Sequence, residues 1–364
     1  MAGQHPLTGD HILIVEDDYF IASQLASKLS DAGILIAGPT PTVADALARL
    51  NQTPLIAGAV LDVILGDELV FSVADELDRR AIPFVFATGF EPDVIPKRHA
   101  DKIVLRKPLA ERSVLDALSQ LPQTEPIRDA DACRNGILAL LSEQTRKMVL
   151  PELKRVTLPQ GAILELPNQK VSRVYFPIDC VLSVVVVATG GSRIETGLIG
   201  SEGLTGAGLS GGDNQTPYEL VTQIQGDTLV MPADGFVSFS SINPELQLLA
   251  ARYARALGVQ VSHTALANGR FDLKQRLARW LAMVHDRVPG KSLQLTHDYL
   301  SVMLGVRRSS VTNTLHVLEG EHLIRSNRGS IEVRDVNGLV AAAGEAYGSP
   351  EAEYHRLMAL PFDK

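Results

Sequence analysis

The sequence predicts a multidomain protein that combines a doubly wound α/β domain, a β-roll followed by a long helix, and a C-terminal winged helix-turn-helix domain. Three patterns predict it: apolar runs alternating with helical segments, then short β-type runs separated by glycine, then two short helical segments around a turn. A chain of 364 residues has room for two or three domains. The expected limits are 1–121 for the α/β domain, 122–132 for a linker, 133–242 for the β-roll, 243–269 for a dimerisation helix, 270–345 for the winged helix-turn-helix and 346–364 for a C-terminal tail.

Composition describes a globular chain, with 45% hydrophobic and 21% charged residues. No apolar run approaches the roughly 20 residues that a membrane helix needs, and residues 1–10 lack the cationic and apolar parts of a secretory signal. The two cysteines, Cys133 and Cys180, form no metal-binding spacing and indicate a reducing compartment. We therefore expect a cytoplasmic protein with no membrane partner.

Five apolar runs in the first domain are typical of buried strands: Ile12–Val15, Ile34–Ala37, Ala59–Leu61, Phe84–Ala87 and Ile103–Leu105. Helical patterns alternate with them, over Tyr19–Ala32, Thr42–Asn51, Glu68–Arg80, Pro92–His99 and Glu111–Leu121. This alternation predicts a five-stranded parallel, doubly wound sheet. In such a sheet the functional site lies beyond the carboxyl ends of the strands.

Polar side chains occupy those strand ends: Glu16 and Asp17 after the first strand, Asp62 after the third, Thr88 after the fourth and Lys107 after the fifth. Three converging carboxylates repel each other unless a cation joins them, and oxygen ligands suit Mg²⁺. An ionised aspartate beside the metal can attack a phosphoryl donor. The lysine would then neutralise the transferred oxygens, and the threonine hydroxyl would bond one of them.

This constellation closely resembles the receiver domain of response regulators over residues 11–121. The runs Leu61–Gly66 and Phe86–Phe90 are similar to the FAT GUY subclass of receivers. The resemblance implies that Asp62 accepts the phosphoryl group, that Mg²⁺ is the cofactor, and that a sensor histidine kinase or a phosphotransfer protein is the donor. Where many receivers carry an aromatic switch residue, this chain has Val104, and Phe90 is the candidate to replace it.

The middle of the chain changes to short strand-like runs broken by glycine, after a helical segment over Asn135–Leu150. The runs predict a β-sandwich or β-roll: Val156–Leu158, Ala162–Leu166, Val174–Phe176, Val181–Ala188, Glu195–Ile199 and Thr228–Met231.

A long helix begins at Asn243-Pro244 and carries an apolar stripe of Leu246, Leu249, Tyr253 and Leu257. A stripe on so long a helix favours pairing with the same helix of a second copy, which predicts a homodimer. The alternative is that the helix packs on its own domain.

The segment that begins at Thr296 has the pattern of a helix-turn-helix. Thr296 is a helix-capping residue, Gly305 can end the first helix, and Val311, Leu315 and Leu318 give the second helix one apolar face. The opposite face presents donors and hydroxyls suited to phosphates and base edges in a major groove, namely Arg308, Ser309, Thr312, Asn313 and His316.

A hairpin with cationic residues near its tip follows this second helix and predicts a wing. The formal net charge of −8 argues little against DNA binding, because the local field is what matters. Five arginines lie in this region: Arg307, Arg308, Arg325, Arg328 and Arg334. The alternative is a winged helix that makes only protein contacts.

Residues 133–360 resemble the Crp/Fnr regulators, most clearly in Gln275–Arg287 and Met303–Thr312. The resemblance implies a β-roll like those that bind cyclic nucleotides. It also implies that Arg308, Ser309 and Asn313 read bases and that Thr296 and Ser310 contact phosphate. We expect the complete DNA-binding set to be Thr296, Arg307, Arg308, Ser309, Ser310, Thr312, Asn313 and Arg328.

The ligand motif of the cyclic-nucleotide-binding members is altered in this chain. Gly203–Leu209 and Thr216-Pro217 lack the glutamate and arginine that hold the ribose and the phosphate, so an anionic nucleotide loses both charged anchors. The sequence also has no ligand set for haem or an iron–sulfur cluster. We therefore expect none of these three cofactors.

The combined reading is a phosphorylation-controlled, sequence-specific DNA-binding transcription regulator of a two-component phosphorelay, and not an enzyme. Its expected partners are promoter DNA, the phosphoryl donor protein, RNA polymerase and a second copy of itself. One alternative is a phosphoryl sink or docking adaptor whose DNA binding does not depend on phosphorylation. Another is a ligand-sensing Crp/Fnr regulator.

Overall fold

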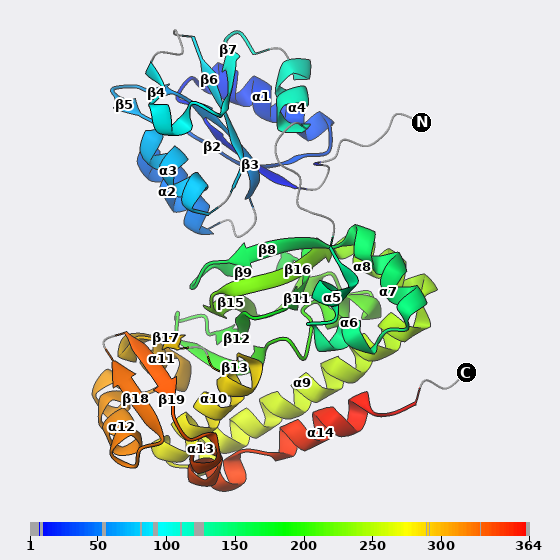
Figure 1. The fold of residues 1–364 in the computed structure, drawn as a ribbon, viewed down its shortest axis with the longest axis vertical. Coiled ribbons are helices and arrows are strands. Elements are labelled where there is room, and N and C mark those ends of the chain that lie inside the picture. Colours follow the sequence, from blue (N-terminus) through cyan, green and yellow to red (C-terminus); the bar gives the residue numbers. More distant parts are fainter. Residues whose placement is uncertain are drawn as a thin grey trace. The chain divides into compact units, whose positions relative to one another are not determined.

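The computed structural model in Figure 1 consists of two compact units, Met1–Glu125 and Pro126–Lys364, and each is described by itself. The structure describes residue 7 and residues 10–52, 56–80, 82–89, 94–109, 111–119, 127–288, 290, 292–327 and 329–361. None of the helices in these ranges has both the length and the apolar character of a membrane-spanning segment.

The first unit contains a parallel five-stranded sheet in the order β2-β1-β3-β6-β7. Its strands are β1 (His11–Val15), β2 (Leu35–Thr40), β3 (Ile56–Asp62), β6 (Phe84–Thr88) and β7 (Ile103–Arg106). Four helices cover it: α1 (Tyr19–Asp31), α2 (Val43–Gln52), α3 (Phe71–Arg79) and α4 (Glu111–Ser119).

Side chains that alternate along the strands build a separate core on each face of this sheet. Leu13 and Val15 pack with residues of α2 and α3, whereas Ile12 and Ile14 pack with residues of α1 and α4. The sheet is therefore doubly wound, as the sequence predicted.

Two helix predictions in this unit were wrong. The third helix begins at Phe71 rather than Glu68, because β4 (Ile64–Leu65) and β5 (Glu68–Leu69) form a small hairpin just before it. In place of the helix expected over Pro92–His99, the described part of this range, residues 94–99, has no α-helix and contains the 3₁₀ turn Lys97–His99. Pro96 lacks the N–H that an α-helix would need at that position. Residues 90–93, including Phe90, lie outside the described residues.

Antiparallel strands form the body of the second unit. One sheet contains β8 (Lys154–Leu158), β11 (Arg173–Pro177) and β16 (Gly226–Pro232). A second contains β9 (Ile163–Glu165), β12 (Val181–Val187), β13 (Arg193–Ile199) and β15 (Glu219–Ile224), and a short pair joins β10 (Gln169–Lys170) to β14 (Gln215–Thr216). The sequence prediction omitted β15 because this strand buries Glu219, Thr222 and Gln223, so its pattern is not apolar.

Short helices precede and follow these strands. The helix expected over Asn135–Leu150 is two helices, α6 (Gly136–Leu140) and α7 (Glu143–Val149), because Leu141 is extended and Ser142 caps α7 by accepting a hydrogen bond from the backbone N–H of Thr145. Two helices beside these strands were not predicted. They are α5 (Asp129–Ala132), inside the expected linker, and α8 (Ala233–Ile242).

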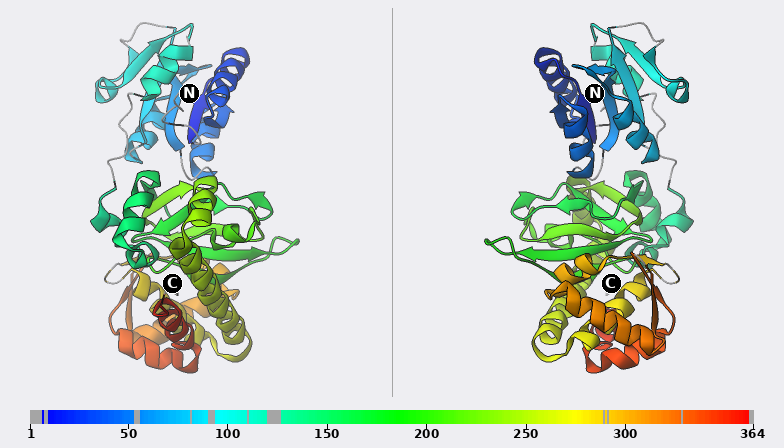
Figure 2. Two further views of the ribbon diagram at one scale, coloured as in Figure 1. Left: turned by 90° about the vertical axis from the view of Figure 1, so that its right-hand side faces the viewer. Right: turned by 90° about the vertical axis from the view of Figure 1, so that its left-hand side faces the viewer.

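Helix α9 (Pro244–Arg270) extends from the β-strands to the last elements of this unit, as Figure 2 shows. Its predicted dimer stripe is corrected by the structure. Leu246, Leu249 and Tyr253 are at most 2% exposed, so they belong to the core of their own chain. Leu257 is half-buried and lies against Gly197 of β13. The stripe therefore packs on its own domain, the alternative that the sequence left open.

The expected C-terminal tail also belongs to the fold. Residues Ser349–Met358 form α14, which packs along α9 (Figure 1). The Arg252 guanidinium on α9 donates hydrogen bonds to the backbone oxygens of Leu360 and Pro361, both at 2.7 Å. These bonds hold the end of the chain against the long helix.

The remaining elements are α10 (Leu273–Arg287), α11 (His297–Leu304), α12 (Arg308–Gly320), α13 (Val336–Ala343) and a sheet in the order β17-β19-β18. Its strands are β17 (Leu293–Gln294), β18 (Ile324–Asn327) and β19 (Ser330–Val333). Their core is continuous with that of the β-strands, because Val181, Leu198 and Ile224 pack into it.

Candidate functional sites

Three carboxylates meet at one edge of the first sheet. One oxygen each from Glu16, Asp17 and Asp62 lie within 4.8 Å of one another. They converge because β1 and β3 are neighbouring parallel strands, and their carboxyl ends share that edge. Glu16 is 4% exposed and Asp62 is 8% exposed, so two of these charges are nearly removed from water.

Lys107 reaches this cluster from the end of β7. Its Nζ lies 2.6 Å from Glu16 Oε2 and 2.5 Å from Asp62 Oδ2. Burial, together with the nearby charge of Asp62, raises the pKa of Glu16 to about 7 although Lys107 acts in the opposite direction. Burial alone would lower the pKa of Lys107, but the hydrogen bonds to Asp62 and Glu16 raise it. One lysine thus compensates the carboxylates only in part.

The neighbouring residues complete the geometry. Thr88 is 2% exposed at the end of β6, the strand beside β3, and its backbone oxygen accepts a hydrogen bond from the N–H of Lys107 at 2.9 Å. Asp17 is exposed and accepts a hydrogen bond from the N–H of Gly66 at 2.9 Å. Asp18 faces away to cap α1 by accepting from the N–H of Phe20 and Ile21.

The donor set of this cluster suits a hard divalent cation. Carboxylate oxygens in a group of three are ligands that Mg²⁺ takes, and its remaining positions are filled by water or phosphate. A cation here would also offset the repulsion between Glu16 and Asp62. Glu16, Asp17 and Asp62 are therefore residues that could hold Mg²⁺.

Two exposed aromatic rings follow the carboxylate run. Tyr19 and Phe20, at the start of α1, are 77% and 78% exposed, and their ring centroids lie 6.1 Å apart in an edge contact. Sequence reasoning assigned them no role, although two aromatic residues directly after an acidic strand end were a visible signal.

The second helix of the helix-turn-helix, α12, has two different faces. Val311, Leu315 and Leu318 are fully buried in the core. The DNA-contact residues predicted on α12 and at its N-cap differ in exposure. Four are exposed: Arg307, Arg308, Ser309 and Asn313. Two are half-buried: Ser310 and Thr312.

The turn before α12 has the predicted geometry. Thr296 caps α11 by accepting a hydrogen bond from the N–H of Tyr299, and Gly305 ends this helix in the left-handed conformation. The hydroxyl of Thr312 is engaged within the motif, because it donates to the backbone oxygen of Arg308 and lies 2.8 Å from His297 Nδ1. Thr312 therefore helps to hold α12 on α11.

The wing is tied to α12 by a side chain. Glu319 accepts a hydrogen bond from the backbone N–H of Ser326 at 2.9 Å. This contact directs the carboxylate of Glu319 toward the wing and away from the polar face of α12. Arg325 on β18 is exposed. The predicted contact residue Arg328 lies outside the described residues.

A buried hydrogen bond that sequence reasoning did not find joins the helix-turn-helix elements to the β-strands. Trp280 Nε1 on α10 donates to Glu195 Oε1 on β13 at 2.6 Å. On α11, Met303 packs with Val185 of β12 and Val221 of β15. The position of the helix-turn-helix is thus coupled to the second sheet.

Comparison with known proteins gives a direct match only for the C-terminal part of the chain. Residues 275–342 match the Crp-like helix-turn-helix domain. No curated protein matches the chain in sequence.

Solved structures align with little more than half of the chain. A protein assigned as a transcriptional regulator of the crp/fnr family from Eubacterium rectale has 16% identity and a TM-score of 0.46, with 58% of this chain and 98% of that chain covered. A CRP-family transcriptional regulator from Thermus thermophilus has 17% identity and a TM-score of 0.45, with 54% and 99% covered. FixK2 from Bradyrhizobium japonicum has 12% identity and a TM-score of 0.46, with 54% and 99% covered.

These TM-scores are below 0.5, so the structural alignments establish no relationship. The match over residues 275–342 spans most of α10, all of α11 and α12, the wing strands and most of α13. The elements that carry the exposed polar face of α12 therefore form a Crp-like helix-turn-helix domain.

Proposed function

We propose that the protein is a sequence-specific DNA-binding transcription regulator whose binding to promoter DNA is controlled by phosphorylation of Asp62. The observation that carries the DNA-binding part is the exposed polar face of α12 within a Crp-like helix-turn-helix domain. The phosphorylation part is supported by the cluster of Glu16, Asp62 and Lys107 at the strand ends of the first unit.

The side chains on α12 suit a major groove. Arg308 can donate two hydrogen bonds to a guanine, and Asn313 can pair with an adenine edge. Ser310 and the capping residue Thr296 would contact phosphates, which position a protein without specifying sequence. Arg325 on the exposed wing strand supplies a further phosphate contact.

Phosphoryl transfer would place a phosphohistidine of the donor protein against Asp62. A carboxylate oxygen of Asp62 attacks the phosphorus, and the phosphorus–nitrogen bond breaks. The departing imidazole nitrogen keeps the electron pair and takes a proton, which leaves an aspartyl phosphate. Lys107 then moves its contact from the carboxylate to a phosphate oxygen, and the Thr88 hydroxyl bonds another.

Magnesium would be held by the three carboxylates Glu16, Asp17 and Asp62. When bound, it would neutralise charge on the transferred phosphoryl group. The donor is a sensor histidine kinase or phosphotransfer protein, and the exposed rings of Tyr19 and Phe20 offer it an apolar contact beside the acidic site. RNA polymerase is the partner expected at the promoter.

A homodimer would use the face of α9 opposite to the buried stripe. Ala251, Gly258 and Ala265 are exposed at seven-residue spacing, and Leu266 is 45% exposed beside them. Small residues at this spacing allow two helices to approach closely. Two winged helices held by such a pair would meet half-sites about one helical turn apart, roughly 34 Å.

We further propose that the β-roll acts without a cyclic nucleotide, haem or iron–sulfur cluster. A Cβ atom at Gly203 would lie 1.9 Å from Cζ of Tyr253, so the loop that begins there is packed directly on α9. Gly206 has a φ of 64°, and Thr216 belongs to the short strand β14. Neither position supplies the charge that would anchor an anionic nucleotide.

Selection of bound sequences from a random DNA pool tests the proposal, with the full-length protein in the presence and absence of acetyl phosphate and Mg²⁺. We expect one inverted repeat to be enriched, with an affinity that responds to the phosphodonor in the wild type and not in Asp62→Asn. Enrichment with equal affinity in both conditions would instead support an adaptor or phosphoryl sink. Absence of any enriched sequence would refute the DNA-binding part.

A further inference from the structure

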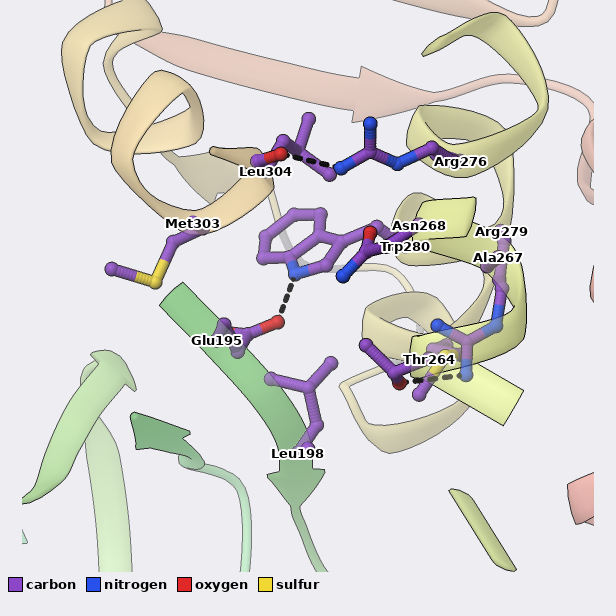
Figure 3. Close-up of a pocket in the computed structure, with 12 residues that line it drawn as sticks. Glu195, Leu198, Thr264, Ala267, Asn268, Arg276, Arg279, Trp280, Met303 and Leu304 are labelled. Atoms are coloured by element: carbon purple, nitrogen blue, oxygen red, sulfur yellow. Dashed lines mark hydrogen bonds between the residues drawn. The ribbon is translucent and has the colours of Figure 1, made fainter. Parts of the chain in front are cut away.

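A small pocket lies where the β-strands, the long helix and the helix-turn-helix domain meet (Figure 3). Its lining comes from four elements, with Glu195 on β13, Thr264 on α9, Arg276 and Arg279 on α10, and Met303 on α11. The cavity volume is about 20 Å³, which is room for one water-sized group. It involves none of the residues assigned to phosphorylation or to DNA contact.

Two arginines with unused donors line this pocket. Arg279 is 5% exposed, and one terminal nitrogen donates to Thr264 Oγ1 at 3.2 Å, but its Nε has no hydrogen-bond partner. Arg276 is half-buried and donates to the backbone oxygen of Leu304, and its Nε is also unpartnered. Buried donors of this kind are nearly always paired in proteins. Positions three apart place the two side chains on one face of α10. One guanidinium reaches Leu304 and the other reaches Thr264 (Figure 3).

The carboxylates that act on these two arginines lie beyond ion-pair distance. Among the described residues, neither Arg276 nor Arg279 has an ion pair with Asp or Glu within 4.0 Å. Burial lowers the pKa of both arginines, and for Arg279 the charges of Glu351 and Glu195 act in the opposite direction.

Glu195 is the one acidic residue among the described residues that line the pocket. Its Oε2 lies 2.5 Å from Ser183 Oγ, which in turn lies 3.0 Å from Gln223 Oε1. Burial raises the pKa of Glu195 to about 7, whereas the hydrogen bonds from Ser183 and Trp280 lower it.

We propose that this pocket binds a small anion between Arg276 and Arg279, either an inorganic ion or the carboxylate end of a short organic acid. Such an anion would accept hydrogen bonds from the unpartnered N–H groups of Arg276 and Arg279 and would compensate their buried charge. Burying unpaired donors and charge is otherwise unfavourable. The proposal does not depend on phosphorylation of Asp62.

The bound anion would connect α9 to the helix-turn-helix domain. Thr264 lies near the end of α9. The chain leaves α9 at Phe271, and α10, which carries the two arginines, begins at Leu273. Arg276 also holds the last carbonyl group of α11 through Leu304. Occupancy therefore stabilises the arrangement of α9, α10 and α11 seen here, in which α11 packs against the β-strands.

The test measures thermal unfolding and calorimetric binding of the full-length protein with sodium chloride and with sodium acetate. Sodium methanesulfonate, whose head group is bulkier than chloride or a carboxylate, keeps the ionic strength constant. We expect a saturable rise in Tm with at least one of the two salts, and the one that acts identifies an inorganic or an organic ligand. Arg279→Gln should weaken binding by about tenfold or more, because it removes a charge-assisted contact.

Three further variants keep the result interpretable. Arg276→Gln changes a less buried arginine and tests the same site if Arg279→Gln does not fold. Arg79→Gln removes one exposed positive charge in the first unit and should leave anion binding unchanged. Wild-type binding should weaken above pH 7, where ionised Glu195 competes with the anion, whereas Glu195→Gln should bind equally at pH 6 and pH 8. No saturable shift with either salt, or equal shifts in wild type and both arginine variants, would overturn the proposal.

Discussion

Replacement of Glu195 by glutamine isolates the cost of burying one carboxyl group. The pKa of this group is 4.5 without burial and about 7 in the folded protein. The folded state therefore keeps a proton that the unfolded chain releases above pH 4.5, and stability falls as the pH rises until the folded pKa is passed. Between pH 5.5 and pH 8 this group alone should remove about 2 kcal/mol from the free energy of unfolding.

Glutamine retains the shape of the carboxyl group but cannot ionise. Its oxygen accepts from Trp280 Nε1 as the carboxyl oxygen does, and its amide can donate to Ser183 Oγ, which donates to the carboxyl in the wild type. Glu195→Gln should therefore have a larger free energy of unfolding than the wild type at pH 8. This difference between the two proteins should be smaller by about 2 kcal/mol at pH 5.5.

Urea unfolding followed by tryptophan fluorescence measures this difference locally, because Trp280 is the single tryptophan of the chain and contacts Glu195 directly. Glu16 and Glu165 also have a pKa raised to about 7, but they are present in both proteins and cancel in the comparison. If the stability difference between the two proteins is constant from pH 5.5 to pH 8, Glu195 does not carry the buried proton that we infer.

Three other predictions concern the phosphorylation site, the DNA-binding face and the dimer. Asp62→Asn should abolish labelling by acetyl phosphate with Mg²⁺, because an amide is not a competent nucleophile, and acid-stable labelling of that variant would place the site elsewhere. Arg308→Ala should weaken specific DNA binding by ~1–3 kcal/mol and relax one base position, whereas Arg325→Ala should weaken all sequences similarly and reduce the salt dependence; binding titrations at several salt concentrations distinguish these outcomes. Gly258→Glu should give a monomer in light scattering. A Cβ atom added at this position has nothing within 4 Å in its own chain beyond its own turn of helix, so the new side chain should disturb the dimer and not the fold. A variant that remains dimeric would exclude this face of α9.

The first unit was the more predictable part of the chain for a topological reason. Parallel strands end at one edge of the sheet, so residues that follow separate strands in the sequence are brought together without any knowledge of packing. Glu16, Asp62 and Lys107 meet in that way. What the pattern could not provide was local detail, such as the hairpin that delays α3 to Phe71.

The pocket at the domain junction was not predictable by the same reasoning. The contact between Glu195 and Trp280 joins residues 85 positions apart through the packing of a strand on a helix. Strand β15 was missed for a related reason, because Thr222 and Gln223 are buried but polar and do not look like core residues in a pattern of hydrophobicity. Buried polar groups are visible only when their partners are known.

Helix α9 shows how a correct helix can be assigned to the wrong neighbour. Its apolar stripe indicates that one face is buried, but periodicity does not say what covers that face. In the structure the cover comes from the same chain, through the β-strands on one side and α14 on the other. Arg255 lies 3.6 Å from Glu353 of α14, so part of the polar face is also used within the chain. What remains for a second copy is the small-residue face around Gly258, where an added Cβ atom would meet no atom within 4 Å apart from its own turn of helix. Arg276 and Arg279 lie on α10, the helix that follows α9. A dimer that pairs two α9 helices would therefore bring two anion pockets and two recognition helices into one assembly.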